Sequence, residues 1–517
     1  MYKLGIDVGG TNTDAVLIDE NLDVVSSVKQ HTTANIYDGI LNAVRAVLEQ
    51  SGVDRKEIRQ AMLGTTQCTN AIVERKNLAP IGILRIGAPA SRGIPLMVDW
   101  SEDLKTIAVG TAIVGGGFEY DGKEIAPFDT AAAGAFFREL KEKDVKSVAI
   151  SCVFSTVRND HELEAAKLCR EIMGKDVHIS ISSEIGSMGL IERENATILN
   201  AALYKVAQSF TEGFAQSLAD EGVTNAQVYL SQNDGTLMTM DYARRYPILT
   251  IACGPTNSIR GACYLSKLKN AVVIDVGGTT TDLGVIQNGF PRESGVAVTI
   301  GGVRTNFRMP DVVSIGLGGG SIVRQREDGT VTVGPDSVGY RITEKALCFG
   351  GDVCTATDIA VRLGMAELGD KALVAHLDRD FAEKALAAIR SLCEDSIDAM
   401  KVSSQDVDVI LVGGGSIILP ADLAGAKSVT QHKFGGVANA IGSAISKVSG
   451  TYEQLMDYDK IPRDEALAKA RAEAVELAVA AGAIRETVEI IDAEDVPLQY
   501  YPGNTARVKI KAAGDLA

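Results

Sequence analysis

One eight-residue pattern occurs twice in this chain, as Asp7-Val-Gly-Gly-Thr-Asn-Thr-Asp14 and as Asp275-Val-Gly-Gly-Thr-Thr-Thr-Asp282. Two adjacent glycines let the backbone turn sharply and approach a ligand closely. Threonine hydroxyls and N–H groups in such a turn can bind phosphate oxygens, and a carboxylate at the end of the preceding strand can hold Mg²⁺. One such loop could be an ordinary hairpin turn. Two copies predict a pair of phosphate-binding hairpins that face each other across a cleft.

Each copy offers one strand-end carboxylate, Asp7 or Asp275, to a single metal–phosphate unit. A P-loop is disfavoured, because the chain has no Gly-x-x-x-x-Gly-Lys-Ser/Thr sequence. A dinucleotide-binding fingerprint is also disfavoured, because the glycine pattern precedes a strand rather than a helix. The residues predicted to bind the cofactor's phosphates are Gly9, Gly10, Thr11, Thr13, Gly277, Gly278, Thr279 and Thr280.

A third glycine-rich segment, Gly413-Gly414-Gly415, follows an apolar run that reads as a buried strand. Glycines there permit the close approach of a flat ligand such as adenosine. The alternative is a plain strand-to-helix turn. Together with the two hairpins, the segment is the expected nucleoside-binding loop. A helix near 433–449 would complete the surface that binds the nucleoside.

A fourth segment contains Gly318, Gly319 and Gly320, within a stretch where four of five residues are glycine. Ordering so many glycines costs conformational entropy, which favours a functional reason over a flexible connector. A fifth segment, Gly64 to Asn70, is polar and leads into a helix. Its threonines could simply cap that helix, but a helix N-terminus beside the cleft also suits an anionic or carbonyl group. The candidate substrate contacts are therefore Thr65, Thr66, Asn70, Gly318, Gly319 and Gly320.

Two weaker candidates remain. The charged cluster Glu192 to Asn195 favours a solvated helix face over a substrate contact. Cys253 precedes a helix, but a cysteine nucleophile there has no base partner visible in the sequence.

Bulk composition narrows the class of protein. The chain has 517 residues, a formal net charge of −16 and eight scattered cysteines without a CxxC pair. The negative charge disfavours nucleic acid and anionic membranes as partners. The N-terminus runs directly into an apolar strand pattern, and no apolar run reaches the roughly 18 residues of a membrane span. We expect a cytoplasmic protein.

Apolar patterns on both sides of each glycine loop predict strand–turn–strand hairpins, and strands alternating with helices elsewhere indicate an α/β fold. The repeat suggests two similar half-molecules. We expect domains at 1–188 and 189–450, with a C-terminal extension at 451–517. The clearest expected helices are 36–51, 130–143, 381–400 and 463–482, and the expected strands include 81–86, 148–154, 248–251 and 407–412.

The order of these motifs resembles that of the hydantoinase/oxoprolinase family, the A-type subunits of ATP-dependent cyclic-amide hydrolases. The resemblance runs from about residue 3 to 450. The segments that carry it are Asp7–Asp14, Gly64–Lys76, Val157–Leu163, Asn195–Asn200, Gly254-Pro255, Asp275–Asp282, Ile315–Ser321 and Val412–Gly415.

The resemblance implies two RNase H-like domains of the sugar kinase/Hsp70/actin type around a nucleotide cleft. It implies that ATP and Mg²⁺ are the cofactors and that Asp7 and Asp275 act catalytically by organising metal and water. Asp14 and Asp282 would mainly brace the hairpins. The γ-phosphate would pass to the carbonyl oxygen of a lactam or hydantoin, and water would open the activated ring, often with a B-type subunit.

Two departures leave the substrate and the B-type interface open. Family members often carry Ser-Gly-Pro-Ala where this chain has Cys253-Gly-Pro-Thr, and they are often longer. A homo- or hetero-oligomer is expected. The alternatives are an ATP-driven reactivating or chaperone-like factor and the ATP-using subunit of a ketone carboxylase.

Overall fold

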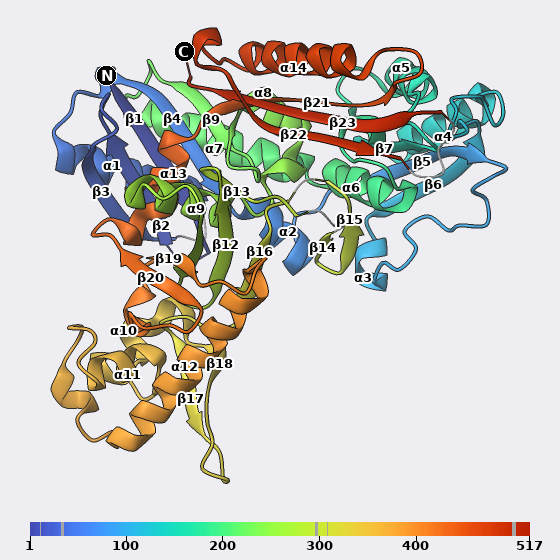
Figure 1. The fold of residues 1–517 in the computed structure, drawn as a ribbon. Coiled ribbons are helices and arrows are strands. Elements are labelled where there is room, and N and C mark those ends of the chain that lie inside the picture. Colours follow the sequence, from blue (N-terminus) through green and yellow to red (C-terminus); the bar gives the residue numbers. More distant parts are fainter. Residues whose placement is uncertain (11, 33–35, 295–297, 308, 499–502, 517) are drawn as a thin grey trace.

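The computed structural model describes residues 1–10, 12–32, 36–294, 298–307, 309–498 and 503–516. Two large sheets form its body, with helices packed between and around them, and the two chain ends lie near each other (Figure 1). The predicted α/β fold is confirmed.

The first sheet has nine strands. β1 (Tyr2–Val8) pairs antiparallel with β2 (Asn12–Ile18) and parallel with β4 (Ile58–Thr65), and β4 in turn pairs parallel with β9 (Gln227–Ser231). From one edge to the other the strands are β22 (Glu489–Pro497), β23 (Thr505–Gly514), β21 (Val448–Asp457), β10 (Leu237–Thr239), β9 (Gln227–Ser231), β4 (Ile58–Thr65), β1 (Tyr2–Val8), β2 (Asn12–Ile18) and β3 (Val24–His31).

The second sheet has six strands. β19 is an unbroken apolar run apart from one aspartate, as is usual for a parallel strand covered on both faces. In order the strands are β13 (Phe290–Pro291), β12 (Thr281–Gln287), β11 (Ala271–Val276), β19 (Val407–Val412) and β20 (Ala426–Gln431), and β16 (Val312–Ile315) pairs with β12.

The cores of the two sheets share one topology. β3-β2-β1-β4-β9 in the first sheet corresponds to β16-β12-β11-β19-β20 in the second. In both, three antiparallel strands are followed by two parallel ones. This repetition is the predicted pair of RNase H-like half-molecules.

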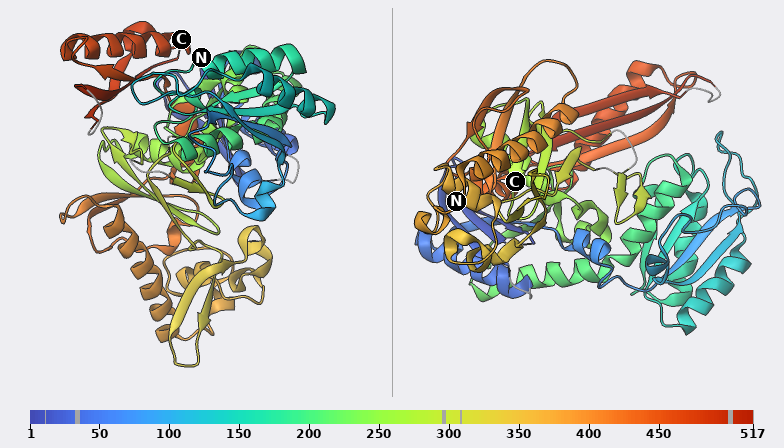
Figure 2. Two further views of the ribbon diagram at one scale, coloured as in Figure 1. Left: turned by 90° about the vertical axis from the view of Figure 1, so that its right-hand side faces the viewer. Right: turned by 90° about the horizontal axis from the view of Figure 1, so that it is seen from below.

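A separate four-stranded parallel sheet is inserted between α2 (Gln67–Glu74) and α6 (Leu190–Ala202). Seen from below, it lies apart from the two large sheets (Figure 2). It consists of β6 (Ala108–Gly115), β5 (Ile81–Ala88), β7 (Ser147–Cys152) and β8 (His178–Ile181), with α3 (Glu102–Lys105), α4 (Thr130–Glu142) and α5 (Asp160–Met173) beside it.

The charged cluster that begins α6 is buried, so the expected solvated face is wrong for Arg193, Glu194 and Asn195. Arg85 on β5 forms an ion pair with Glu194 at 2.5 Å, and the Trp100 indole N–H donates to Asn195 Oδ1 at 2.8 Å. These partners come from the inserted unit, and they join it to α6.

A second excursion lies between β12 and β19 and projects away from the body at the bottom of Figure 1. Earlier in the same stretch, β14 (Val298–Ile300) and β15 (Val303–Thr305) form a small hairpin that contacts α2 and α6. The projecting part contains β17 (Ser321–Gln325), β18 (Val331–Ser337), α10 (Ile342–Lys345), α11 (Ala356–Arg362) and α12 (Arg379–Met400).

The C-terminal strands extend the first sheet, and α14 (Arg463–Ala480) covers one face of them (Figure 1). Every fourth residue along α14 is a buried alanine, so the helix lies close to the sheet. The first sheet therefore takes strands from all three of the segments expected at 1–188, 189–450 and 451–517. Those boundaries remain predictions, and the sheet pairing crosses both of them.

Two helices pass between the sheets, α9 (Cys253–Ser266) and α13 (Ala438–Ile445). They cross with backbones in contact, because a Cβ placed on Gly261 would lie 1.9 Å from the carbonyl oxygen of Ala438. The other helices of the body are α1 (Ile36–Ser51), α7 (Tyr204–Asp220) and α8 (Met240–Arg245).

The expected helix at 36–51 is α1 to the residue. The expected strand at 248–251 is wrong, since Pro247–Thr250 is a 3₁₀ helix. Pro247 lacks the N–H that a sheet would use, and a short apolar run does not distinguish a strand from a buried helical turn. The helix expected near 433–449 is shorter, because β21 already begins at Val448. Within the described residues, we find no helix that is long and apolar enough to cross a membrane.

Candidate functional site

The two copies of the repeat form hairpins with the same turn. The N–H of Gly9 donates to the carbonyl of Asn12 at 3.0 Å, and the N–H of Gly277 donates to that of Thr280 at 2.9 Å. Thr11 lies outside the described residues. The remaining predicted phosphate-binding residues of the turns are half-buried (Gly9, Gly277, Gly278) or exposed at the tips (Gly10, Thr279, Thr280).

Thr13 has a different environment from the other predicted phosphate contacts. It is fully buried, and its hydroxyl lies 3.3 Å from that of Thr32. Thr32 also donates to the carbonyl of Gly9 at 2.8 Å. We therefore propose that Thr13 braces the first turn from within.

Each hairpin sets two aspartates directly opposite one another, Asp7 with Asp14 and Asp275 with Asp282. Asp7 and Asp14 are almost fully buried. The repeat thus places equivalent carboxylates on both sheets.

Side chains from the two interdomain helices hold these carboxylates. On α9, Asn257 donates to Asp7 Oδ1 at 3.1 Å, and Ser258 donates to Asp275 Oδ2. On α13, Asn439 donates to Asp7 Oδ2 at 3.0 Å and to Asp14 Oδ2 at 2.9 Å. α9 therefore connects the two hairpins by hydrogen bonds, and α13 holds both aspartates of the first hairpin.

Lys29 on β3 lies opposite Asp14 in the sheet register, and its ammonium is 2.7 Å from Asp14 Oδ1. Its charge also extends to the second hairpin, where it lowers the pKa of Asp275 against the stronger effect of burial. Lys29 therefore pairs with Asp14 and also acts electrostatically on Asp275.

Burial raises the pKa of all four aspartates. The pKa of Asp7 rises to about 6, because the loss of hydration outweighs the hydrogen bonds from Asn257 and Asn439. Burial likewise raises the pKa of Asp14 and Asp275, and that of Asp282 to about 6. Carboxylates that are kept from water in this way are favourable neighbours for a divalent cation, whose preferred ligands are such hard oxygens.

A glycine lies against each strand-end aspartate, at the end of the neighbouring parallel strand. A Cβ on Gly64 would lie 2.3 Å from Asp7 Oδ1, and a Cβ on Gly413 would lie 2.3 Å from Asp275 Oδ1. β4 and β19 hold the same place in their sheets, so the Gly64 and Gly413 segments are structural counterparts. The sequence did not show this, because the two segments share only a glycine.

The predicted nucleoside loop lies directly beside the second hairpin. The N–H of Gly415 donates to the carbonyl of Val276 at 2.8 Å, and Gly413 has a positive φ of 84°. A Cβ on Gly414 would meet no protein atom within 4 Å. The loop is thus anchored at both ends and open at its middle residue.

The glycines at 318–320 pack under the second turn. Gly319 and Gly320 donate their N–H groups to the carbonyls of Gly277 and Gly278 at 3.0 and 2.8 Å. The N–H of Gly318 donates to Ser321 Oγ. All three donors are used within the protein, so we propose that Gly318, Gly319 and Gly320 support the second turn rather than contact a substrate.

The other predicted substrate contacts lie beside the first turn. Thr66 donates through its N–H and its hydroxyl to the carbonyl of Val8, and Asn70 donates to Thr66 Oγ1 at 3.4 Å. Thr65 hydrogen-bonds through its backbone to the Cys253 thiol. Burial raises the pKa of that thiol well above its usual range, which fits a structural cysteine. Thr66 and Asn70 remain half-buried at the start of α2.

Sequence reasoning missed Lys29, Asn257, Ser258 and Asn439. Lys29 could have been found from the sequence by predicting that β2 pairs with β3, since that register places Lys29 opposite Asp14. The other three side chains lie on α9 and α13. Asn257 and Asn439 are 250 and 432 residues from Asp7 in the chain, and Ser258 is 17 residues from Asp275 but belongs to a different element.

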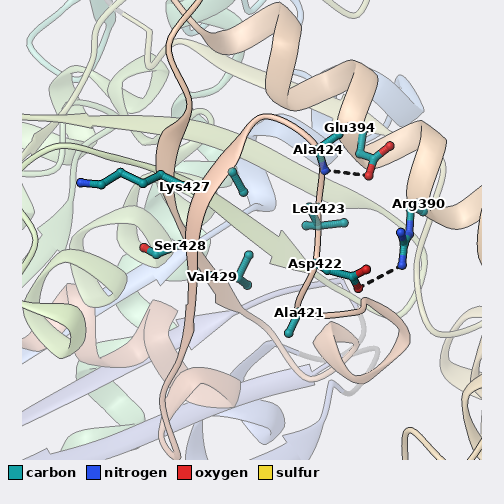
Figure 3. A pocket seen from close by; sticks show the side chains of 10 residues that line it. Arg390, Glu394, Ala421, Asp422, Leu423, Ala424, Lys427, Ser428 and Val429 are labelled. Carbon is teal, nitrogen blue, oxygen red and sulfur yellow. Dashed lines mark hydrogen bonds and ion pairs between the residues drawn. The ribbon is translucent and has the colours of Figure 1, made fainter.

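A surface hollow of about 390 Å³ lies elsewhere, between α12 and the segment that leads into β20 (Figure 3). Arg390 forms an ion pair with Asp422 at 3.0 Å, and Glu394 accepts the N–H of Ala424 at 2.7 Å. No residue of either hairpin lines this hollow, and its charged groups are already paired, so the hairpins are the better candidate site.

Two equivalent hairpins, each with a facing pair of aspartates and connected through α9, define a two-domain α/β protein of the nucleotide-binding class. Two family profiles match the chain, hydantoinase/oxoprolinase N-terminal region over residues 3–173 and hydantoinase/oxoprolinase over residues 193–400. The chain belongs to the hydantoinase/oxoprolinase family, whose members use ATP.

Three relatives illustrate the range of this family. The caprolactamase subunit alpha of Pseudomonas jessenii is 27% identical over 75% of this chain. The acetophenone carboxylase gamma subunit of Aromatoleum aromaticum and the 5-oxoprolinase of Saccharomyces cerevisiae are each 26% identical over 70% of it. The matched regions span only 58%, 53% and 31% of these relatives.

Solved structures show the same fold. The ATP-dependent caprolactamase from Pseudomonas jessenii has a TM-score of 0.79 at 20% identity, covering 99% of this chain and 87% of that chain. A nucleotide-free acetone carboxylase has a TM-score of 0.69 at 18% identity, covering 99% and 88%.

Proposed function

We propose that this chain is the ATP-using subunit of an enzyme that phosphorylates a small cyclic amide and opens its ring. The observation that carries the proposal is the pair of equivalent hairpins whose strand-end aspartates, Asp7 and Asp275, are held by neighbouring residues of α9. The similarity to a caprolactamase subunit and to 5-oxoprolinase supports a cyclic amide as the substrate class.

Phosphorylation of the carbonyl oxygen would make the ring of a cyclic amide easier to open. An amide oxygen is a poor leaving group, and a phosphorylated oxygen is a good one. In the proposed reaction the γ-phosphoryl group of ATP moves to the ring carbonyl oxygen. Water then attacks the ring carbon, and the ring C–N bond breaks, with a proton passing to the nitrogen, to leave an acyl phosphate. A second water hydrolyses this acyl phosphate to the carboxylate and inorganic phosphate. The net products are ADP, inorganic phosphate and the open-chain amino acid. Catalysis of such transfers consists mainly of positioning and charge stabilisation.

The donor set suits Mg²⁺. This ion typically takes one or two protein carboxylates and fills its other positions with water and phosphate oxygens. Asp7 and Asp275 are such a pair, and the described residues contain no cluster of three or more His, Cys, Asp or Glu side chains that would form a complete protein cage. Mg²⁺ bound there would supply neutralising charge to the phosphates. Asp7 and Asp275 would fix its position, and Lys29 would add a second positive charge.

The exposed turn residues would bind the phosphates, and the loop at Gly414 would receive the nucleoside. Thr66 and Asn70 would contact the ring amide from the start of α2. We further propose that the chain works with a second, B-type chain, because the related caprolactamase and carboxylase chains are named as subunits.

The test is ATP turnover with Mg²⁺ and a panel of 5-oxoproline, hydantoins and larger lactams, with and without a B-type chain. We expect at least one ring amide to stimulate turnover. The second candidate function is the ATP-using subunit of a ketone carboxylase, favoured by the match to acetophenone carboxylase. Stimulation only by a ketone with bicarbonate would support it against the first. Turnover that no small molecule stimulates would favour an ATP-driven reactivating factor.

A steric variant tests the nucleotide site itself. In Gly414→Val the new side chain meets no protein atom at its Cβ, so the apo protein should keep its melting temperature. We expect ADP affinity to fall about tenfold or more, which is about 1.4 kcal/mol or more. Gly93→Val, at a similarly open glycine of the inserted unit, is the matched control and should bind ADP as the wild type does. Unchanged ADP binding in Gly414→Val would remove this loop from the site.

A further inference from the structure

Two neighbouring residues of α9 each bind one of the strand-end aspartates. Asn257 donates to Asp7 on the first sheet, and Ser258 donates to Asp275 on the second. Adjacent residues on a helix have a fixed spacing and direction. One rigid element therefore connects the two carboxylates that come from opposite domains.

Both donors are buried, and their surroundings leave them little freedom. A Cβ on Gly64 would lie 2.3 Å from Asp7 Oδ1 and 2.3 Å from Asn257 Nδ2. The hydrogen bond between Asp7 and Asn257 therefore depends on the absence of a side chain at position 64. A Cβ on Gly442 of α13 would lie 1.8 Å from the carbonyl oxygen of Asn257, so the helix crossing fixes the backbone at this residue as well.

The orientation of Asn257 is informative. Its Nδ2 faces Asp7, while its Oδ1 is buried and has no hydrogen-bond partner among the described residues. A buried amide oxygen normally accepts a hydrogen bond. This unpaired oxygen beside Asp7 could accept a hydrogen bond from a water molecule in the hydration shell of a bound cation.

We propose that Asn257 and Ser258 are positioning residues that set the separation and orientation of Asp7 and Asp275, so that both carboxylates reach one divalent cation bound with the nucleotide phosphates. Neither residue touches the reacting atoms. Each acts through the aspartate that it holds, and side chains in such positions typically change metal affinity 10–100-fold when they are removed. The inference rests on the nucleotide and metal use of the proposed function, but not on the identity of its amide substrate.

The experiment measures Mn²⁺ binding to the full chain by electron paramagnetic resonance, with ADP present. In Asn257→Ala and in Ser258→Ala we expect the Mn²⁺ dissociation constant to rise about tenfold or more. ADP affinity without metal should stay within about twofold, because no phosphate contact is removed. A general loss of structure would lower both affinities together.

Three further variants sharpen the result. Ser258→Thr keeps the hydroxyl and should retain most of the Mn²⁺ affinity. Ser266→Ala makes the same change as Ser258→Ala on the same helix. The Ser266 hydroxyl donates to the carbonyl of Cys263 and accepts the N–H of Leu268, away from the aspartates, so this variant should behave as the wild type. Gly64→Ala removes no polar group but separates Asp7 from Asn257, so it should reproduce Asn257→Ala.

Unchanged Mn²⁺ affinity in both alanine variants would overturn the inference, as would a parallel loss of metal-free ADP binding. The proposed function fails separately. If the wild type binds Mn²⁺ with ADP and the variants lose it, but no ring amide stimulates turnover, the positioning role stands and the substrate proposal falls. A wild type that binds no Mn²⁺ with ADP would overturn both.

Discussion

At the scale of single residues, the site concentrates negative charge that the fold alone does not neutralise. Asp7 accepts hydrogen bonds from two amide donors and forms no ion pair within the described residues, while Asp14 is paired with Lys29. Burial keeps the pKa of Asp7 near 6, well above the ordinary value of about 3.9 for an aspartate. The free protein should therefore be less stable at neutral pH than it would be with a neutral group at this position.

We predict that Asp7→Asn loses metal-dependent ATP turnover but is more stable than the wild type at neutral pH without metal. Asn257 can turn its unpaired Oδ1 toward the new amide. The folded wild type holds the Asp7 proton more tightly than the unfolded chain does, so its stability falls as the pH rises from about 4 to about 6. The variant does not lose stability in this way. The difference in the free energy of unfolding between the variant and the wild type should therefore grow over that pH interval to about 1–3 kcal/mol in favour of the variant.

Urea unfolding at pH 4.5, 6.0 and 7.5 in chelator measures this difference. Asp241→Asn, at an exposed aspartate of α8, is the control and should show no growing advantage. A stability difference for Asp7→Asn that does not change with pH would contradict the raised pKa.

At the scale of elements, the inserted four-stranded sheet is joined to the body by charged groups inside the protein. Arg85 of β5 binds Glu194 of α6 through two nitrogens, and Ser151 of β7 donates to the same carboxylate. Neither charged side chain is more than 2% exposed. Removing one member of such a pair leaves the other charge buried, and this is usually more destabilising than removing both.

We predict that Arg85→Met lowers the free energy of unfolding by about 3–5 kcal/mol. The double variant Arg85→Met/Glu194→Gln should recover a large part of this, because a neutral amide can still accept the Ser151 hydroxyl. Urea unfolding of the wild type, both single variants and the double variant completes a double-mutant cycle for this ion pair. A double variant as unstable as Arg85→Met, with Glu194→Gln alone near the wild type, would show that the ion pair is not the cause.

At the scale of the whole molecule, the C-terminal strands connect the two halves. Lys511 of β23 lies 3.0 Å from Asp234 in the β9–β10 turn and 3.0 Å from Glu293, which follows β13 of the second sheet. Lys509 binds Glu293 as well, at 2.8 Å. Both lysines are less than 10% exposed. The final strand thus binds the second sheet to the first through buried charges.

We predict that Lys511→Met lowers the melting temperature by several degrees, on the scale of about 2 kcal/mol. It should also speed amide hydrogen exchange in β23 and around Glu293, while exchange in the inserted sheet stays as in the wild type. Lys427→Met, at an exposed lysine of the second sheet, is the matched control. Equal exchange in both variants would mean that β23 is held by its sheet pairing alone.

The sequence by itself determined the repeat, the α/β class and many element positions. These are local properties: α1 follows from the spacing of its apolar residues, and each hairpin follows from two apolar runs around a glycine turn. The family resemblance followed from the order of the same motifs, and the profile matches bear it out.

The tertiary structure decided which polar groups surround the aspartates. Asn257, Ser258 and Asn439 reach the hairpins because α9 and α13 cross between the sheets. Asn257 and Asn439 are 250 and 432 residues from Asp7 in the chain. The same holds for Gly319 and Gly320, whose N–H groups donate to carbonyls of the second turn. A local pattern shows that a glycine or an amide is present, but only the packing of distant segments decides which group it contacts.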